Sequence, residues 1–171
     1  MLESISSKAV TAVAVLALLG TVIGYFQAQN GALEEEHFRA MCYSVARAVD
    51  GLSSLNGGAS LNITFRAEGA GLHLDPSFRG KAYQVEFRAS QIIFRQGELV
   101  AAKGFIRPVH LWDPNAAADG AAITSDILLE RLDSEHNVLR TVSGNELSME
   151  RVPLLVSGLK VYHTFVTLST T

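Results

Sequence analysis

The chain of 171 residues contains a single cysteine, Cys42, and only four prolines, the first of them at Pro76. One cysteine excludes an intrachain disulfide framework and any zinc or iron–sulfur site built from four cysteines. Charged side chains make up only 18% of the residues and the formal net charge is −3, so the chain lacks the basic surface of a nucleic-acid-binding protein. The hydrophobic fraction of 48% excludes a disordered chain and indicates one folded domain with an appendage.

The longest uncharged, apolar segment runs from Ala9 to Phe26. A helix over its 18 residues would be roughly 27 Å long, close to the hydrocarbon thickness of a bilayer. Its large apolar side chains would cost on the order of 15–30 kcal/mol if they stayed in water. We therefore expect the segment to lie in a membrane or to pack against copies of itself. The residues expected at such a helix core are Val13, Leu16, Leu19, Gly20, Ile23, Gly24 and Phe26.

Three further features bear on this segment. A cleaved secretory signal is the competing interpretation, but Lys8 is the only basic residue before the run and no small-x-small cleavage site follows it. Gly20 and Gly24 form a small-xxx-small pair, which lets helix backbones approach closely, although glycine is also simply common in membrane helices. Lys8 before the run and the acidic residues Glu34–Glu36 after it favour an N-terminus inside the cell and a C-terminus outside.

The helical pattern continues beyond Phe26 in amphipathic form. Asn30-Gly31 is the only point in this stretch with low helix propensity, and a single glycine destabilises a helix by only about 1 kcal/mol. We therefore predict one helix from about Glu3 to Leu55. The expected domains are a helical part, 1–56, with an apolar half (9–26) and an amphipathic half (32–55), and a globular β domain, 57–171. The stripe expected to pack on the β domain consists of Phe38, Met41, Cys42, Val45, Val49 and Leu52.

After Gly58 the apolar residues alternate with polar ones, which is the period of β-strands. Short strands separated by Gly, Pro and Asn turns predict an antiparallel sandwich or barrel. The expected strands are Leu61–Phe65, Tyr83–Phe87, Gln91–Arg95, Leu99–Phe105, Val109–Trp112, Ile127–Leu132, Val138–Val142 and Gly158–Leu168.

The run Ala9–Phe26, its continuation Leu33–Leu52 and the strands from Leu61 onward together resemble the archaeal type IV pilins and archaellins. The resemblance covers the whole architecture and rests on pattern. It implies an α+β fold in which a long hydrophobic helix precedes an immunoglobulin-like β-sandwich. Pilin precursors of this kind carry a short basic leader cut before the apolar run, and Lys8-Ala9 is a candidate for such a site. Glu3 is the only candidate for the glutamate that bacterial pilins place near the mature start.

No pattern of catalytic residues, cofactor ligands or metal ligands stands out, and we expect neither an enzyme nor a cofactor. Cys42 paired with a histidine would be a nucleophile, but its place on the apolar stripe favours a buried core thiol. Glu34-Glu-Glu-His37 would start a metal site only with a second Glu-x-x-His, which the sequence lacks. The remaining histidines have no ligand spacing: His73, His110, His136 and His163.

The resemblance implies a structural role, as a subunit of an extracellular filament at the cell surface for adhesion or surface attachment. The expected partners are identical copies, the membrane before assembly, and a surface layer or pilus assembly machinery, with no nucleic acid. The alternative is a single-span membrane protein whose β-sandwich outside the cytoplasm binds a surface-layer, secretion or archaellum component. Asn62-Ile63-Thr64 is the only N-glycosylation triplet, and such triplets also arise by chance.

Overall fold

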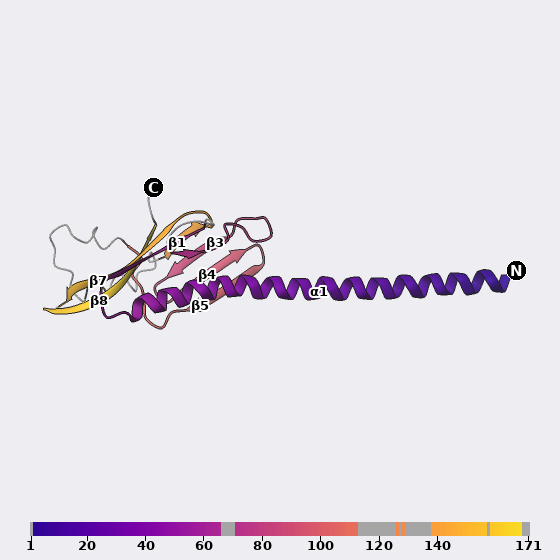
Figure 1. Cartoon of the computed structure of the whole chain (residues 1–171), viewed down its shortest axis with the longest axis horizontal. Coiled ribbons are helices and arrows are strands. Elements are labelled where there is room, and N and C mark those ends of the chain that lie inside the picture. The colour runs from indigo at the N-terminus through magenta and orange to yellow at the C-terminus, as the bar shows by residue number, and fades with distance from the viewer. Residues whose placement is uncertain are drawn as a thin grey trace. The chain divides into compact units, whose positions relative to one another are not determined.

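The protein has an α+β fold with one N-terminal helix and two antiparallel-rich sheets, as the sequence predicts at this level (Figure 1). Our computed structural model describes residues 2–65, 71–112, 126, 128, 138–156 and 158–168, with side chains from Leu16 onward. Two compact units divide the chain, Met1–His37 and Phe38–Thr171. The boundary between these two units lies inside the helix, because the amphipathic half of the helix contributes to the core of the second unit.

Helix α1 (Leu2–Ser54) continues through Asn30-Gly31 without interruption, so the expected weak point does not break it. The prediction of one long N-terminal helix is therefore confirmed. The part of the chain described by the structure holds no helix long and apolar enough to cross a membrane, contrary to the span expected over 9–26. From Leu16 the apolar stretch is short, since Gln27 opens a polar continuation; residues 9–15, Val13 included, have side chains outside the described set.

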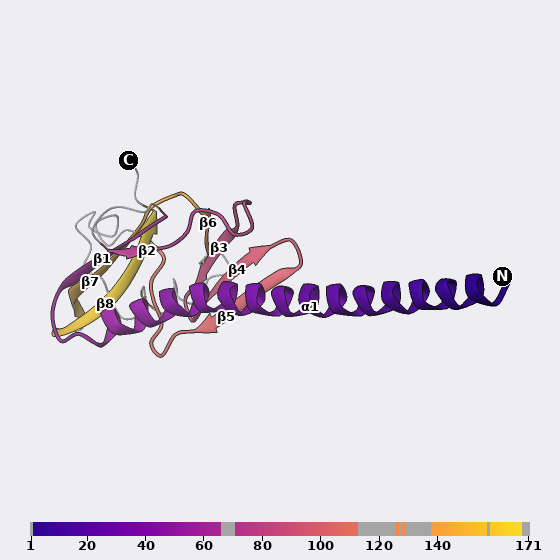
Figure 2. The same cartoon turned by 45° about the vertical axis from the view of Figure 1, so that its right-hand side comes forward.

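The strands form two sheets of four among the described residues (Figure 2). The first sheet has the order β2-β1-β7-β8, and β1 pairs with β2 in parallel while its other neighbours run antiparallel. The second sheet is antiparallel throughout, in the order β5-β4-β3-β6. The bounds in the first sheet are β1 (Ala59–Thr64), β2 (Leu72–His73), β7 (Leu147–Val156) and β8 (Leu159–Leu168). Those in the second are β3 (Gln84–Arg88), β4 (Gln91–Gln96), β5 (Leu99–Gly104) and β6 (Val138–Val142).

Six of the expected strands are present, with bounds that differ by at most two residues: β1, β3, β4, β5, β6 and β8. The strand expected at Val109–Trp112 is wrong, because only His110 pairs there, in a single parallel bridge with Phe165. At Ile127–Leu132 a strand was expected, but Leu128 is helical; the other residues of that range lie outside the described set. The sequence prediction also missed β2 and the ten-residue strand β7.

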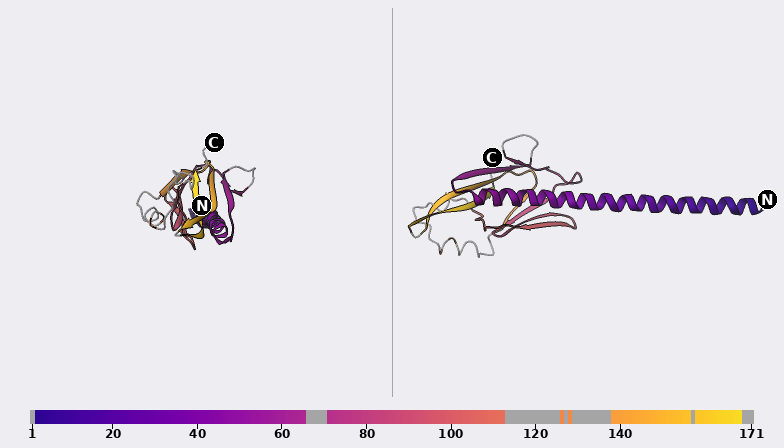
Figure 3. Two further views of the ribbon diagram at one scale, coloured as in Figure 1. Left: turned by 90° about the vertical axis from the view of Figure 1, so that its left-hand side faces the viewer. Right: turned by 60° about the horizontal axis from the view of Figure 1, so that its bottom comes forward.

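The core of the second unit unites the helix with both sheets (Figure 3). Phe38 contacts the rings of Phe78, Tyr83 and Phe94, with centroids 4.9, 5.8 and 6.0 Å away. At the other end of this helical half, the Ser53 hydroxyl lies 2.9 Å from the Thr164 hydroxyl of β8. The second half of α1 thus has its own partner inside the β domain.

Candidate assembly surface

The first unit carries a continuous set of large apolar side chains that are exposed to solvent. Each of them retains between 49% and 68% of its accessible surface: Leu16, Leu18, Leu19, Val22, Ile23, Tyr25, Phe26 and Leu33. Contiguous apolar surface of this kind marks an interaction site in a natural protein. The residues expected to pack at a helix core, from Leu16 to Phe26, therefore lie on the surface of the first unit and are available to a partner.

The opposite side of this helical segment carries small residues. With 3.6 residues per turn, Ala17, Gly20, Thr21 and Gly24 fall together on one side of α1, away from most of the large side chains. A Cβ added at Gly20 or Gly24 would meet no atom within 4 Å. The segment therefore offers both protruding side chains and a narrow surface that accepts a neighbouring helix.

Two side-chain hydrogen bonds of this segment are made within the helix. The Thr21 hydroxyl donates to the Leu18 carbonyl at 2.8 Å, and Gln29 Nε2 donates to the Tyr25 hydroxyl at 2.7 Å. Burying these groups against a partner would leave fewer unsatisfied hydrogen bonds, which are costly in an apolar contact. Burial of this surface would therefore leave these hydrogen bonds intact.

The amphipathic stripe of α1 lies in a different environment. Phe38, Met41, Cys42, Val45, Val49 and Leu52 are all buried in the core of the second unit. The Cys42 thiol lies 3.5 Å from the Ala101 carbonyl of β5, and burial raises its pKa to about 12. A thiol held protonated in this way is a core side chain rather than a nucleophile.

The acidic segment Glu34–Glu36 and His37 are exposed. Among the described residues no group of three or more His, Cys, Asp or Glu side chains is arranged to hold a metal ion. Asn62 is exposed on β1, opposite Ser148 of β7, so its side chain is accessible to a modifying enzyme.

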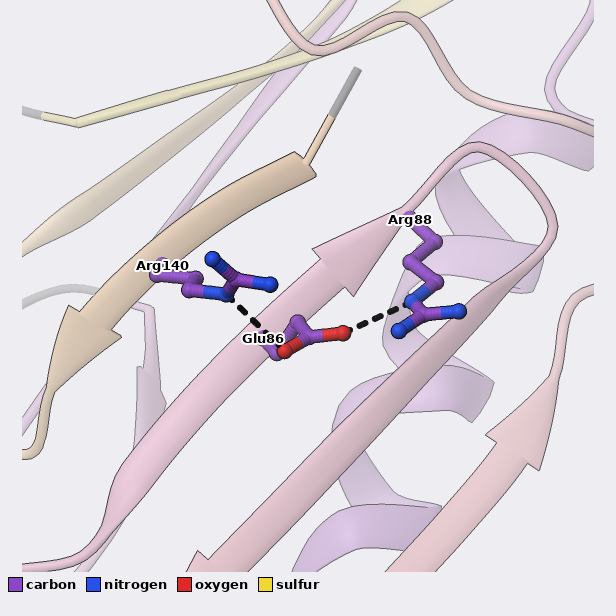
Figure 4. Close-up of polar contacts among 3 residues, drawn as sticks. All are labelled: Glu86, Arg88 and Arg140. Carbon is purple, nitrogen blue, oxygen red and sulfur yellow. Dashed lines mark hydrogen bonds and ion pairs between the residues drawn. The ribbon is translucent and has the colours of Figure 1, made fainter. Parts of the chain in front are cut away.

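Sequence reasoning missed a charged triad on the second sheet. Glu86 of β3 accepts hydrogen bonds from Arg88 Nε at 2.7 Å and from Arg140 Nε of β6 at 3.1 Å (Figure 4). Burial raises the pKa of the Glu86 carboxyl, but the two arginines outweigh it and the net pKa is lowered. Because Glu86 is fully engaged, the triad ties β3 to β6 and leaves no free carboxylate for acid–base chemistry.

Sequence reasoning also missed a pair of histidines. His110 and His163 are 53 residues apart, yet His110 Nε2 lies 3.0 Å from His163 Nδ1. Only the pairing of residue 110 with the edge of β8 brings them together, and no local spacing signals it.

No family model matches the chain, and neither a curated protein nor a solved structure is significantly similar to it.

Proposed function

We propose that the protein is a structural subunit of an extracellular filament of the type IV pilus kind, assembled through the N-terminal part of α1. The supporting observation is the exposed apolar surface between Leu16 and Leu33, whose large side chains each keep about half or more of their surface accessible. Burying such side chains contributes about 25 cal/mol per Å² of apolar area removed from water, which favours association of many copies. The role requires no catalytic residue and no cofactor.

Self-association follows from the two unlike sides of the helical segment. The large side chains of one copy, such as Ile23 and Phe26, would pack against the small side of the next copy around Gly20 and Gly24. Such a contact joins two different surfaces and does not close on itself unless the rotation between copies happens to close a ring. Repetition of the contact then generates a fibre, with the β domains outside.

The proposal extends to the type of β domain, its role on the filament surface and its further partners. The β domain would be an immunoglobulin-like sandwich of the pilin type, since two four-stranded sheets share one core with the amphipathic half of α1. It would provide adhesion or surface attachment, with Asn62 available for a glycan on the filament exterior. The surface layer and an assembly machinery are the further partners that this role entails.

The test compares two exposed isoleucines, one in each unit. Ile23 is 54% exposed on the apolar surface, and Ile106 is 84% exposed in the second unit. We expect Ile23→Glu to abolish fibres in negative-stain images of the purified chain and of sheared cell-surface material, because a carboxylate is not accommodated in an apolar contact. Ile106→Glu is the control and should leave the fibres intact.

Two outcomes would overturn the proposal. One is a wild-type chain that forms no fibres and remains as small particles dispersed by detergent, which would favour the anchored alternative. The other is an equal effect of the two substitutions, which would show that the apolar surface has no special part in assembly.

A further inference from the structure

The two histidines meet at the outer edge of β8. His110 donates its backbone N–H to the Thr164 carbonyl at 2.9 Å and accepts from the Val166 N–H at 2.8 Å. Because bridge partners share a face of the sheet, the His110 side chain lies beside Phe165, with ring centroids 5.1 Å apart. His163, two residues earlier on β8, projects from the same face. Trp112 completes this aromatic cluster, with its ring centroid 4.7 Å from that of His110.

The ring–ring hydrogen bond requires at least one ring nitrogen of the pair to be unprotonated. His110 Nε2 and His163 Nδ1 are 3.0 Å apart, so one donates and the other must accept. His110 Nδ1 and His163 Nε2 are buried, and neither has a hydrogen-bond partner among the described residues. A first added proton therefore places an N–H where no acceptor is described, and a second abolishes the bond between the rings.

The charges around the pair also oppose protonation. Burial, followed by the charge of His163, lowers the pKa of His110 to about 4. Burial and then the positive charge of Arg151 on β7 lower the pKa of His163. Arg107, on the segment that precedes His110, acts on Arg151 in the same sense.

No described carboxylate is bonded to either ring. Glu150 of β7 lies opposite Phe165 on the same face but is exposed, and Asp50 of α1 accepts from the Ile106 N–H. The titratable side chains on β8 that are closest in sequence to His163 are Lys160 and Tyr162, and Lys160 Nζ lies 5.7 Å from the centroid of the Tyr162 ring. An imidazolium at this position therefore has no described carboxylate as a direct hydrogen-bond partner.

We infer that the His110–His163 pair is an acid-sensitive latch, which holds the segment around His110 against the edge of β8 at neutral pH and releases it on acidification. Both pKa values are lowered in the folded chain, so the released state binds more protons. The stabilisation is complete above the ordinary histidine pKa of 6.5 and is lost as the pH falls toward about 4. Release leaves the backbone of β8 unpaired at its edge, which is a surface for strand addition.

Amide hydrogen exchange on the full chain tests the latch directly. The amides of His110 and Val166 make the bridge, and the amide of Ser143, which donates to the Tyr83 carbonyl, is the control. We expect the protection factors of the first two to fall by at least about tenfold between pH 7 and pH 5, after correction for intrinsic exchange, while that of Ser143 changes little. Equal behaviour of the three amides would overturn the inference.

Two amide substitutions separate titration from packing. His110→Gln places an amide near the position of Nε2, and His163→Asn places one near that of Nδ1, so the double variant keeps a hydrogen bond that cannot be protonated. Its bridge protection should become insensitive to pH over this range, whereas the control His37→Gln should behave like wild type. If the double variant does not fold, ring titration of the wild type by NMR decides: both rings must titrate below 6.5, and a value at or above it refutes the latch.

Discussion

At the scale of single residues, the structure shows tertiary contacts that the local sequence does not predict. Gly71 has φ +129°, and a Cβ built on it would lie 2.1 Å from the Asn62 carbonyl oxygen. The sequence Glu68-Gly69-Ala70-Gly71 by itself indicates only a turn, because the close approach of Gly71 to β1 is a tertiary contact. The meeting of His110 with His163 is of the same kind, whereas the buried thiol of Cys42 follows from its position on a helical stripe.

Replacing Gly71 by alanine should therefore destabilise the second unit in two ways. A positive φ costs about 1–3 kcal/mol for a residue with a side chain, and the contact with backbone adds a cost of similar size. Gly144→Ala is the matched control, because Gly144 has φ +110° but open space around it. Chemical denaturation should show a lower free energy of unfolding for Gly71→Ala than for Gly144→Ala. Equal losses would mean that the backbone near Asn62 moves aside freely.

At the scale of elements, the sequence predicts α1 well and the first sheet poorly. The helix follows from the three- to four-residue spacing of its apolar stripe and the absence of proline before Pro76. Strand β7 was missed because Glu150, Arg151 and Pro153 interrupt its apolar alternation. The structure explains how Pro153 is tolerated: β1 pairs with β7 only over Leu147–Arg151, so a residue without an N–H lies beyond that ladder.

Two phenylalanines of α1 test the division of the helix between the units. Phe38 is 1% exposed and Phe26 is 58% exposed. Phe38→Ala should lower the free energy of unfolding of the second unit by about 3–5 kcal/mol, because it leaves a cavity among aromatic rings. Phe26→Ala should leave that free energy nearly unchanged, as measured by denaturation of the dispersed chain. A comparable decrease in the free energy of unfolding for both variants would contradict the conclusion that Phe38, and not Phe26, belongs to the core.

At the scale of the whole molecule, the two halves of one helix lie in different environments. The apolar side chains of its second half are buried in the core of the second unit, whereas those of the first unit are exposed. The composition of the segment 9–26 predicts that its apolar side chains are buried, but it does not distinguish burial in lipid from burial against the helices of other copies. The hydrogen bonds of Thr21 to the Leu18 carbonyl and of Gln29 to the Tyr25 hydroxyl are visible only in three dimensions.

Glycine-to-leucine substitutions test close helix packing between copies. Gly20→Leu and Gly24→Leu meet no atom within 4 Å in the single chain, and leucine favours a helix by about 1 kcal/mol over glycine, so the chain should remain folded. We expect a clear loss of fibre yield, measured by sedimentation. Gly51→Leu, which also meets no atom within 4 Å, is the control and should assemble normally. Undiminished yield for the Gly20 and Gly24 variants would remove the small side of the helix from the assembly contact.

The C-terminal end of α1 has no basic residue in its last turn, and two arginines from elsewhere bind its carbonyls instead. Arg107 donates to the Ser53 carbonyl at 3.1 Å, and Arg151 donates to the Leu55 carbonyl at 2.7 Å. A tensile load transmitted along the helix would reach the β domain through these bonds together with the core around them. Since these bonds come from two different segments of the fold, the load would be shared between them and would not fall on a frayed helix end alone.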